Sequence, residues 1–162
     1  MSPVIKSGYA APRAPGKNEL ADARIALLAT RWNTEVVNAL LRGARACLKD
    51  WGVAQSQLFY APGAYEIPLA LKYLAQSGDW HGAVTLGAVI RGDTPHFDFV
   101  AGQCARGVQD VALSHGFPTG FGVLTVNDAK QAKDRCGPGR TNKGYEAAAA
   151  TLEMLRLKRQ LS

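Results

Sequence analysis

Residues Leu86–Val100 have the sequence LGAVIRGDTPHFDFV, which contains the end of a buried strand, a tight turn and the start of a helix. The run Ala83–Ile90 is almost entirely apolar and has no polar alternation, as is typical of a strand covered on both faces in a parallel sheet. After it comes a glycine-containing turn in which Thr94 is a good N-cap and Pro95 suits the first helical position. The pattern predicts that His96 lies in the first turn of a helix.

Such a turn suits a bound anion. Free backbone N–H groups and the positive end of the helix dipole attract phosphate and disfavour a protonated imidazole. We therefore expect His96 to be neutral and able to accept a proton near pH 7. The alternative interpretation is that His96 is simply a polar residue at a helix start.

The length and composition indicate one globular domain. A chain of 162 residues can bury a normal core, and 47% hydrophobic with 20% charged residues excludes disorder over most of the length. Residues 1–20 are rich in proline and glycine and predict an irregular arm that adds an edge strand or lies on a neighbouring subunit. Residues 21–162 then form the single α/β domain.

The cysteines indicate the cellular location of the protein, and the charges indicate the class of ligand that it binds. Cys47, Cys104 and Cys136 are odd in number and widely spaced, which argues against a disulfide framework and a zinc site and favours a cytoplasmic location. No apolar run is long enough to span a bilayer, and the N-terminus lacks the core of a signal peptide, so we expect no membrane association. The net charge is +6, but the basic residues are scattered, which favours small anionic ligands over nucleic acid.

Strands and helices are expected to alternate along the chain. The predicted strands are Arg24–Thr30, Gln57–Ala61, Ala83–Ile90 and Phe121–Val126. Helices are expected from a cap at Asn33 to Gly52, from near Ala64 to Ser77, from His96 to Gly116 and from about Tyr145 to Arg159, with a short helical piece before the last. This order predicts a three-layer αβα sandwich around a mainly four-stranded parallel, flavodoxin-like sheet.

Ligands of such sheets bind beyond the carboxyl ends of the strands, so the loops that follow the strands should converge. These loops are Arg31–Asn33, Pro62–Glu66, Ile90–His96 and Asn127–Lys143. Their unusual residues are two aromatics, a carboxylate, a base and cations: Trp32, Glu66, His96, Phe121, Arg135 and Lys143.

Together these residues suit a flat heterocycle and a phosphate ester. Each also has a simpler interpretation. The aromatics pack, Arg135 is solvated, Glu66 favours its helix start and Lys143 belongs to a turn. The residues alone indicate an α/β enzyme acting on a phosphorylated small molecule.

Several short motifs resemble those of the lumazine synthase family in order and spacing, over roughly residues 20–160. They are Arg31-Trp32-Asn33, PGAYEIP from Pro62 to Pro68, GAVIRGDTPHFDFV from Gly87 to Val100, FGVLT from Phe121 to Thr125, and Asn142-Lys143-Gly144. The resemblance implies a transferase that condenses 5-amino-6-(D-ribitylamino)uracil with 3,4-dihydroxy-2-butanone 4-phosphate. The product is 6,7-dimethyl-8-ribityllumazine, in riboflavin biosynthesis.

The resemblance also implies residue roles. His96 matches the proton-transfer residue, and Trp32 matches an aromatic that stacks on the uracil ring. The ribitylaminouracil site is implied at Trp32, Ala64, Tyr65, Glu66, Ala88, Val89, Ile90 and Phe121. The phosphate site is implied at Gly92, Asp93, Thr94, Arg135 and Lys143. Phe121 and Arg135 match residues that a neighbouring subunit supplies.

No metal or redox cofactor is expected, because phosphate is a good leaving group and its charge can be held by the turn and Arg135. The implied partners are the small-molecule substrates, further copies in a pentamer or a multiple of pentamers with shared active sites, and riboflavin synthase.

Two positions and one segment depart from the family pattern. Trp32 is larger than the usual phenylalanine. Asp93 adds a carboxylate to the phosphate turn, where it must point away or pair with a cation such as Arg91. The segment Gly137-Pro138-Gly139-Arg140-Thr141 differs from the pattern of shell-forming members, which favours a ring over a shell.

Two other functions fit part of the sequence. A binding or storage protein would keep the pocket without turnover, against which the intact His96 and Arg135 argue. A flavodoxin-like electron carrier would share the sheet but needs a phosphate loop after the first strand, and Thr30-Arg31-Trp32-Asn33 is a poor one.

Overall fold

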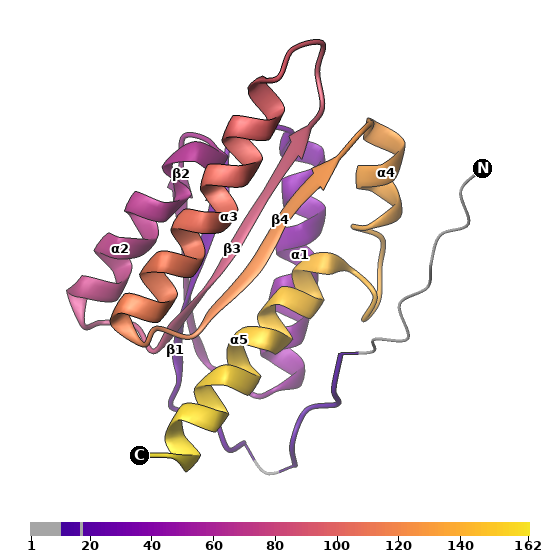
Figure 1. The fold of residues 1–162 in the computed structure, drawn as a ribbon. Helices are drawn as coiled ribbons and strands as arrows, with labels where there is room; N and C mark the ends of the chain where they lie inside the picture. The colour runs from indigo at the N-terminus through magenta and orange to yellow at the C-terminus, as the bar shows by residue number, and fades with distance from the viewer. Residues whose placement is uncertain (1–10, 17) are drawn as a thin grey trace.

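All strands run parallel in one sheet in the computed structural model, which describes residues 11–16 and 18–162. The strands are β1 (Arg24–Thr30), β2 (Gln55–Ala61), β3 (Gly82–Ile90) and β4 (Thr119–Val126). Their order across the four-stranded sheet is β2-β1-β3-β4 (Figure 1). This arrangement confirms the predicted parallel, flavodoxin-like sheet.

Helices cover both faces of the sheet. They are α1 (Thr34–Asp50), α2 (Ile67–Ser77), α3 (His96–His115), α4 (Ala129–Asp134) and α5 (Lys143–Gln160), with a 3-10 turn, η1 (Ala64–Glu66), before α2. Figure 1 shows α2 and α3 on one side of the sheet and α1 and α5 on the other. The predicted three-layer sandwich is therefore confirmed.

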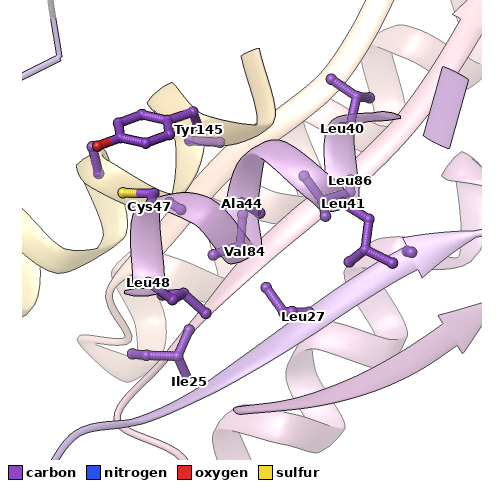
Figure 2. Packing of buried hydrophobic residues seen from close by; sticks show 14 of the residues in the cluster. Ile25, Leu27, Leu40, Leu41, Ala44, Cys47, Leu48, Val84, Leu86 and Tyr145 are labelled. Carbon is purple, nitrogen blue, oxygen red and sulfur yellow. The ribbon is translucent and has the colours of Figure 1, made fainter. Parts of the chain in front are cut away.

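The central strand β3 is enclosed on all sides, which explains its apolar sequence. It pairs with β1 on one edge and β4 on the other, and its first seven residues are buried. Val84 and Leu86 pack towards α1 and α5, whereas Ala83 packs towards α2 and α3. Figure 2 shows the first of these layers, in which Leu27 of β1 and Leu86 of β3 lie beneath the side chains of α1.

Helices α1 and α5 cover one face because glycines let them approach closely. A Cβ on Gly144 would collide with the Leu40 carbonyl of α1, and a Cβ on Gly43 would collide with the Asn142 side chain. Asn142 is buried, and its Nδ2 donates to the carbonyl oxygens of Ala39 (3.1 Å) and Gly137 (2.9 Å). Its Oδ1 accepts from the N–H of Gly144 at 2.7 Å, so this one amide ties α1 to the start of α5.

Three predicted boundaries were wrong by two residues. Strand β2 begins at Gln55 rather than Gln57, because an edge strand tolerates the exposed polar residues that hid its start. Strand β4 begins at Thr119 rather than Phe121. Helix α5 begins at Lys143 rather than about Tyr145, because Asn142 is its N-cap.

The predicted N-terminal arm is only partly within the described residues, since 1–10 and 17 lie outside them. Its described part forms no helix or strand and packs on its own chain. Ala11 and Leu20 are buried in the α1/α5 core, and Glu19 Oε2 lies 2.7 Å from Arg156 Nε of α5. Within the described part of the chain, no helix has the length and apolar character that a membrane span requires.

Because α1 and α5 approach closely, we expect a glycine-to-alanine substitution to have opposite effects on the free energy of unfolding at two helical positions. Gly144→Ala should lower the free energy of unfolding by about 1–3 kcal/mol, because the added methyl forces the helices apart. Gly102→Ala, in α3 with nothing within 4 Å, should raise it by roughly 0.5–1 kcal/mol through helix propensity. Urea denaturation at one protomer concentration measures both, and equal effects would contradict the close-approach argument.

Candidate active site

A cavity of about 610 Å³ lies at the carboxyl edge of the sheet, between the loops that follow β1, β2 and β3. It contains most of the residues that the sequence singled out. These are Trp32, Ala64, Tyr65, Glu66, Ala88, Val89, Ile90, Gly92, Thr94 and His96.

The first two loops bring an aromatic ring and a carboxylate together across Gly63. A Cβ on Gly63 would lie 3.2 Å from Glu66 Oε2 and 3.3 Å from Trp32 Cδ1, so both side chains border this glycine. Trp32 is 71% exposed and Tyr65 is 62% exposed. Trp32 is therefore not a core residue of its own chain, and its ring is exposed on the wall of the cavity.

Asn33 is the main cavity residue that the sequence analysis did not assign to the site. It was expected to cap α1, and it occupies the N-cap position, but its side chain makes no capping hydrogen bond. Instead its backbone is left-handed, with φ 55°, and its Nδ2 donates to the Ala88 carbonyl at 2.9 Å. Asparagine is one of the few residues that tolerates this conformation, and its place in the short loop between β1 and α1 was the available signal. The other unassigned lining residues are Thr30, Gly63, Phe97, Phe99 and Val100.

The third loop delivers His96 to the cavity. Helix α3 begins at His96 with Pro95 as its N-cap, one residue later than the expected cap at Thr94. Thr94 still contributes, because its Oγ1 accepts from the His96 N–H at 3.4 Å. The imidazole is therefore at the first residue of a helix, next to the exposed glycine turn, as the sequence predicted.

Arg91 does not pair with Asp93, contrary to one of the two expectations for that carboxylate. Arg91 Nη2 lies 3.4 Å from Asp98 Oδ1, and its guanidinium lies 4.3 Å from the centre of the Phe97 ring. Asp98 lies in the first turn of α3, where its carboxylate can meet the guanidinium. Asp93 is exposed and does not line the cavity.

The remaining predicted residues lie in a second groove, of about 550 Å³, along the free edge of β4. Phe121, Arg135 and Lys143 line it together with Glu146, whose Oε2 lies 2.7 Å from Lys143 Nζ. The Lys143 N–H donates to the Arg135 carbonyl at 2.8 Å, which joins the two cations through the backbone. The expectation that four loops share one cavity therefore holds for three within a single chain, because β4 is an edge strand.

In the part of the chain that the structure describes, the thiols and the acidic side chains do not form a reactive nucleophile or a cluster of metal ligands. Burial raises the pKa of Cys47 and Cys104 to about 12 and also raises the pKa of Cys136, so these thiols stay protonated at neutral pH. Among residues 11–16 and 18–162, no three His, Cys, Asp or Glu side chains gather in a group that could hold a metal ion. The chemistry available in the cavity is that of the imidazole, the Glu66 carboxylate and the turn.

A parallel sheet with a ligand-sized cavity at the carboxyl ends of its strands is the arrangement typical of α/β proteins that bind small molecules at this edge. The family model of 6,7-dimethyl-8-ribityllumazine synthase matches residues 22–159. The chain is also 44% identical over 148 residues to the 6,7-dimethyl-8-ribityllumazine synthase of Nitratidesulfovibrio vulgaris (strain DSM 19637 / Miyazaki F), covering 90% of this chain and 95% of that relative. The chain belongs to the 6,7-dimethyl-8-ribityllumazine synthase family.

Proposed function

We propose that this protein condenses 5-amino-6-(D-ribitylamino)uracil with 3,4-dihydroxy-2-butanone 4-phosphate. The products are 6,7-dimethyl-8-ribityllumazine, phosphate and water, as in riboflavin biosynthesis. The observation that carries this proposal is the single cavity that holds an exposed indole, a carboxylate and a helix-start imidazole, in Trp32, Glu66 and His96. Membership of the family supports it.

The ribitylaminouracil binds between Trp32 and the end of β3. The exposed indole stacks on the flat ring, and the backbone of Ala88, Val89 and Ile90 supplies hydrogen-bonding groups along its edge. Glu66 accepts hydrogen bonds from the substrate's polar groups, next to Ala64 and Tyr65.

The phosphate of the second substrate binds at the turn of Gly92, Asp93 and Thr94. This turn precedes α3, so free N–H groups and the positive end of the helix face the anion. The turn needs a cation beside it, and Arg135 and Lys143 supply the charge from another copy of the chain. Phe121 comes with them, because all three line one groove.

The reaction requires repeated proton transfer near the phosphate. The primary amine of the uracil attacks the ketone, water leaves to form an imine, phosphate is eliminated, and the ring closes with loss of a second water. His96 takes up and returns these protons, because it lies on the cavity wall beside the phosphate turn. Holding both substrates in one cavity supplies much of the remaining acceleration.

The division of these residues between two grooves supports a closed ring of copies. A monomer would have its own Trp32 and His96 but would lack Arg135 beside them. A repeated head-to-tail contact brings the β4 groove of one copy to the cavity of the next, and such contacts close into rings. We propose a homopentamer of one-domain subunits, formed by residues 21–162 with an N-terminal arm of residues 1–20. It acts in the cytoplasm and associates with riboflavin synthase.

The assay of the proposed function is lumazine fluorescence after the two substrates are mixed, compared with the uncatalysed reaction. We expect His96→Ala to lower turnover by about 100-fold, near the lower end of acid–base contributions, because proximity and the spontaneous condensation remain. His115→Ala, at the opposite end of α3, is the matched control and should keep full activity. A wild-type protein that binds the product without accelerating its formation would instead be a storage protein, and unchanged turnover in His96→Ala would remove that residue from the mechanism.

Arg135→Ala should act chiefly on the KM of the butanone phosphate. The proposed contact is with a group already charged in the ground state, so about 1.5–3 kcal/mol of binding free energy should be lost while kcat changes little. Arg45→Ala removes the same charge from an exposed position on α1 and should leave KM unchanged. If Arg135→Ala also leaves KM unchanged, Arg135 does not contact the phosphate.

Light scattering under assay conditions tests the shared site. We expect a particle of five protomers, each of 17.3 kDa, as the smallest active species. A fully active monomer or dimer would contradict the shared-site proposal. A mass near twelve pentamers would keep that proposal and would show that Pro138 does not prevent a shell.

A further inference from the structure

Arg135 is carried by a helix too short to be stable by itself. Helix α4 has six residues, and Arg135 is its C-cap. A single isolated turn and a half gains little from its own hydrogen bonds, so contacts at its two ends decide whether it keeps its shape. The position of the Arg135 guanidinium therefore depends on what holds α4.

Gln131 contacts both ends of this helix. Its N–H donates to Asp128 Oδ1 at 2.8 Å, and its own side-chain Oε1 accepts the Asn127 N–H at 2.7 Å. These two bonds resemble a capping box. In that motif the side chain of the N-cap residue accepts the backbone N–H three positions later, and the side chain at that later position accepts a backbone N–H at the helix start. The Gln131 carbonyl also accepts from Arg135 Nη1 at 3.0 Å.

Asn127, whose N–H donates to the Gln131 side chain, is itself held by Arg91. Asn127 Oδ1 accepts from Arg91 Nε at 3.2 Å, and the Arg91 N–H donates to the carbonyl of Val126, the last residue of β4, at 2.9 Å. On the inner side of α4, Ala132 is fully buried in the core. The Gln131 amide thus connects the start of α4 to a segment braced by the sheet.

We propose that Gln131 is a positioning residue that orients Arg135 for the phosphate; this rests on the phosphate-binding role proposed above for Arg135. A guanidinium has five N–H donors in a rigid plane, so one bond to the Gln131 carbonyl sets the direction of the others. An arginine oriented in advance loses less side-chain freedom when the phosphate binds. Loss of the Gln131 amide should therefore weaken substrate binding and leave the chemical steps unchanged.

The first test compares variants of α4 in steady-state kinetics of the complete assembly. Gln131→Leu removes the amide at similar size and should raise the KM of the butanone phosphate by about threefold to tenfold, as expected for one hydrogen bond, with kcat within about twofold. Gln131→Glu keeps an acceptor for the Asn127 N–H and should restore most of the affinity. Lys130→Gln removes an exposed ion pair with Asp134 on the same helix and should leave KM unchanged. A KM in Gln131→Leu equal to that of the wild type would overturn the proposal.

The second test asks whether Gln131 acts through Arg135. In an Arg135→Ala background, adding Gln131→Leu should change KM no further, whereas an added effect of the same size would overturn the proposal. Crystal structures of the wild type and Gln131→Leu give a readout that does not depend on activity. We expect the Arg135 guanidinium to leave the 131 carbonyl in the variant, and an unmoved guanidinium would overturn the proposal. If Arg135→Ala alone leaves KM unchanged, the phosphate role is wrong, and the crystal structures still decide the positioning role.

Discussion

The cavity depends on the point at which β1 and β3 separate. The two strands pair from Ile25 with Gly82 up to Ala29 with Leu86, after which β3 continues to Ile90 against β4 alone. Their following helices lie on opposite faces of the sheet, so the chain leaves the sheet in two directions and opens a gap at its carboxyl edge (Figure 1). The Asn33 amide bridges this gap to the Ala88 carbonyl, which keeps the first loop next to the end of β3.

Much of this architecture could be predicted because a strand that is buried on both faces has a continuous apolar sequence. The apolar run of β3 and the exact bounds of β1 follow from enclosure by helices and neighbouring strands. Edge strands have a weaker apolar pattern, because they tolerate exposed polar residues such as Gln55, which do not distinguish a strand from a loop. The start of α5 was missed for a different reason: the signal was local, because the Asn142 Oδ1 accepts from the N–H groups of Gly144 and Tyr145 as an N-cap, and the glycine-rich segment before it hid this cap.

The candidate site was harder to predict where it depends on the choice between nearby partners. The sequence offered Asp93 as a partner for Arg91, but the helical direction of α3 brings Asp98 to the guanidinium instead. The separation of Arg135 from His96 follows from strand order, which no local pattern encodes. Motifs therefore indicated the residue types of the candidate site, whereas the distribution of these residues between two grooves required the three-dimensional arrangement.

The purely parallel sheet also has a consequence for how the chain acquires its structure. Each strand must wait for an intervening helix before its partner arrives, so no local hairpin is available as an early nucleus. The chain loses conformational entropy in closing long loops before it gains the contacts between paired strands. This loss slows folding and leaves apolar segments such as β3 uncovered for longer. Nascent chains are then most vulnerable to aggregation before β3 is covered on both edges. Refolding at low protein concentration, or slow synthesis, therefore favours the native sheet over aggregation of incompletely folded chains.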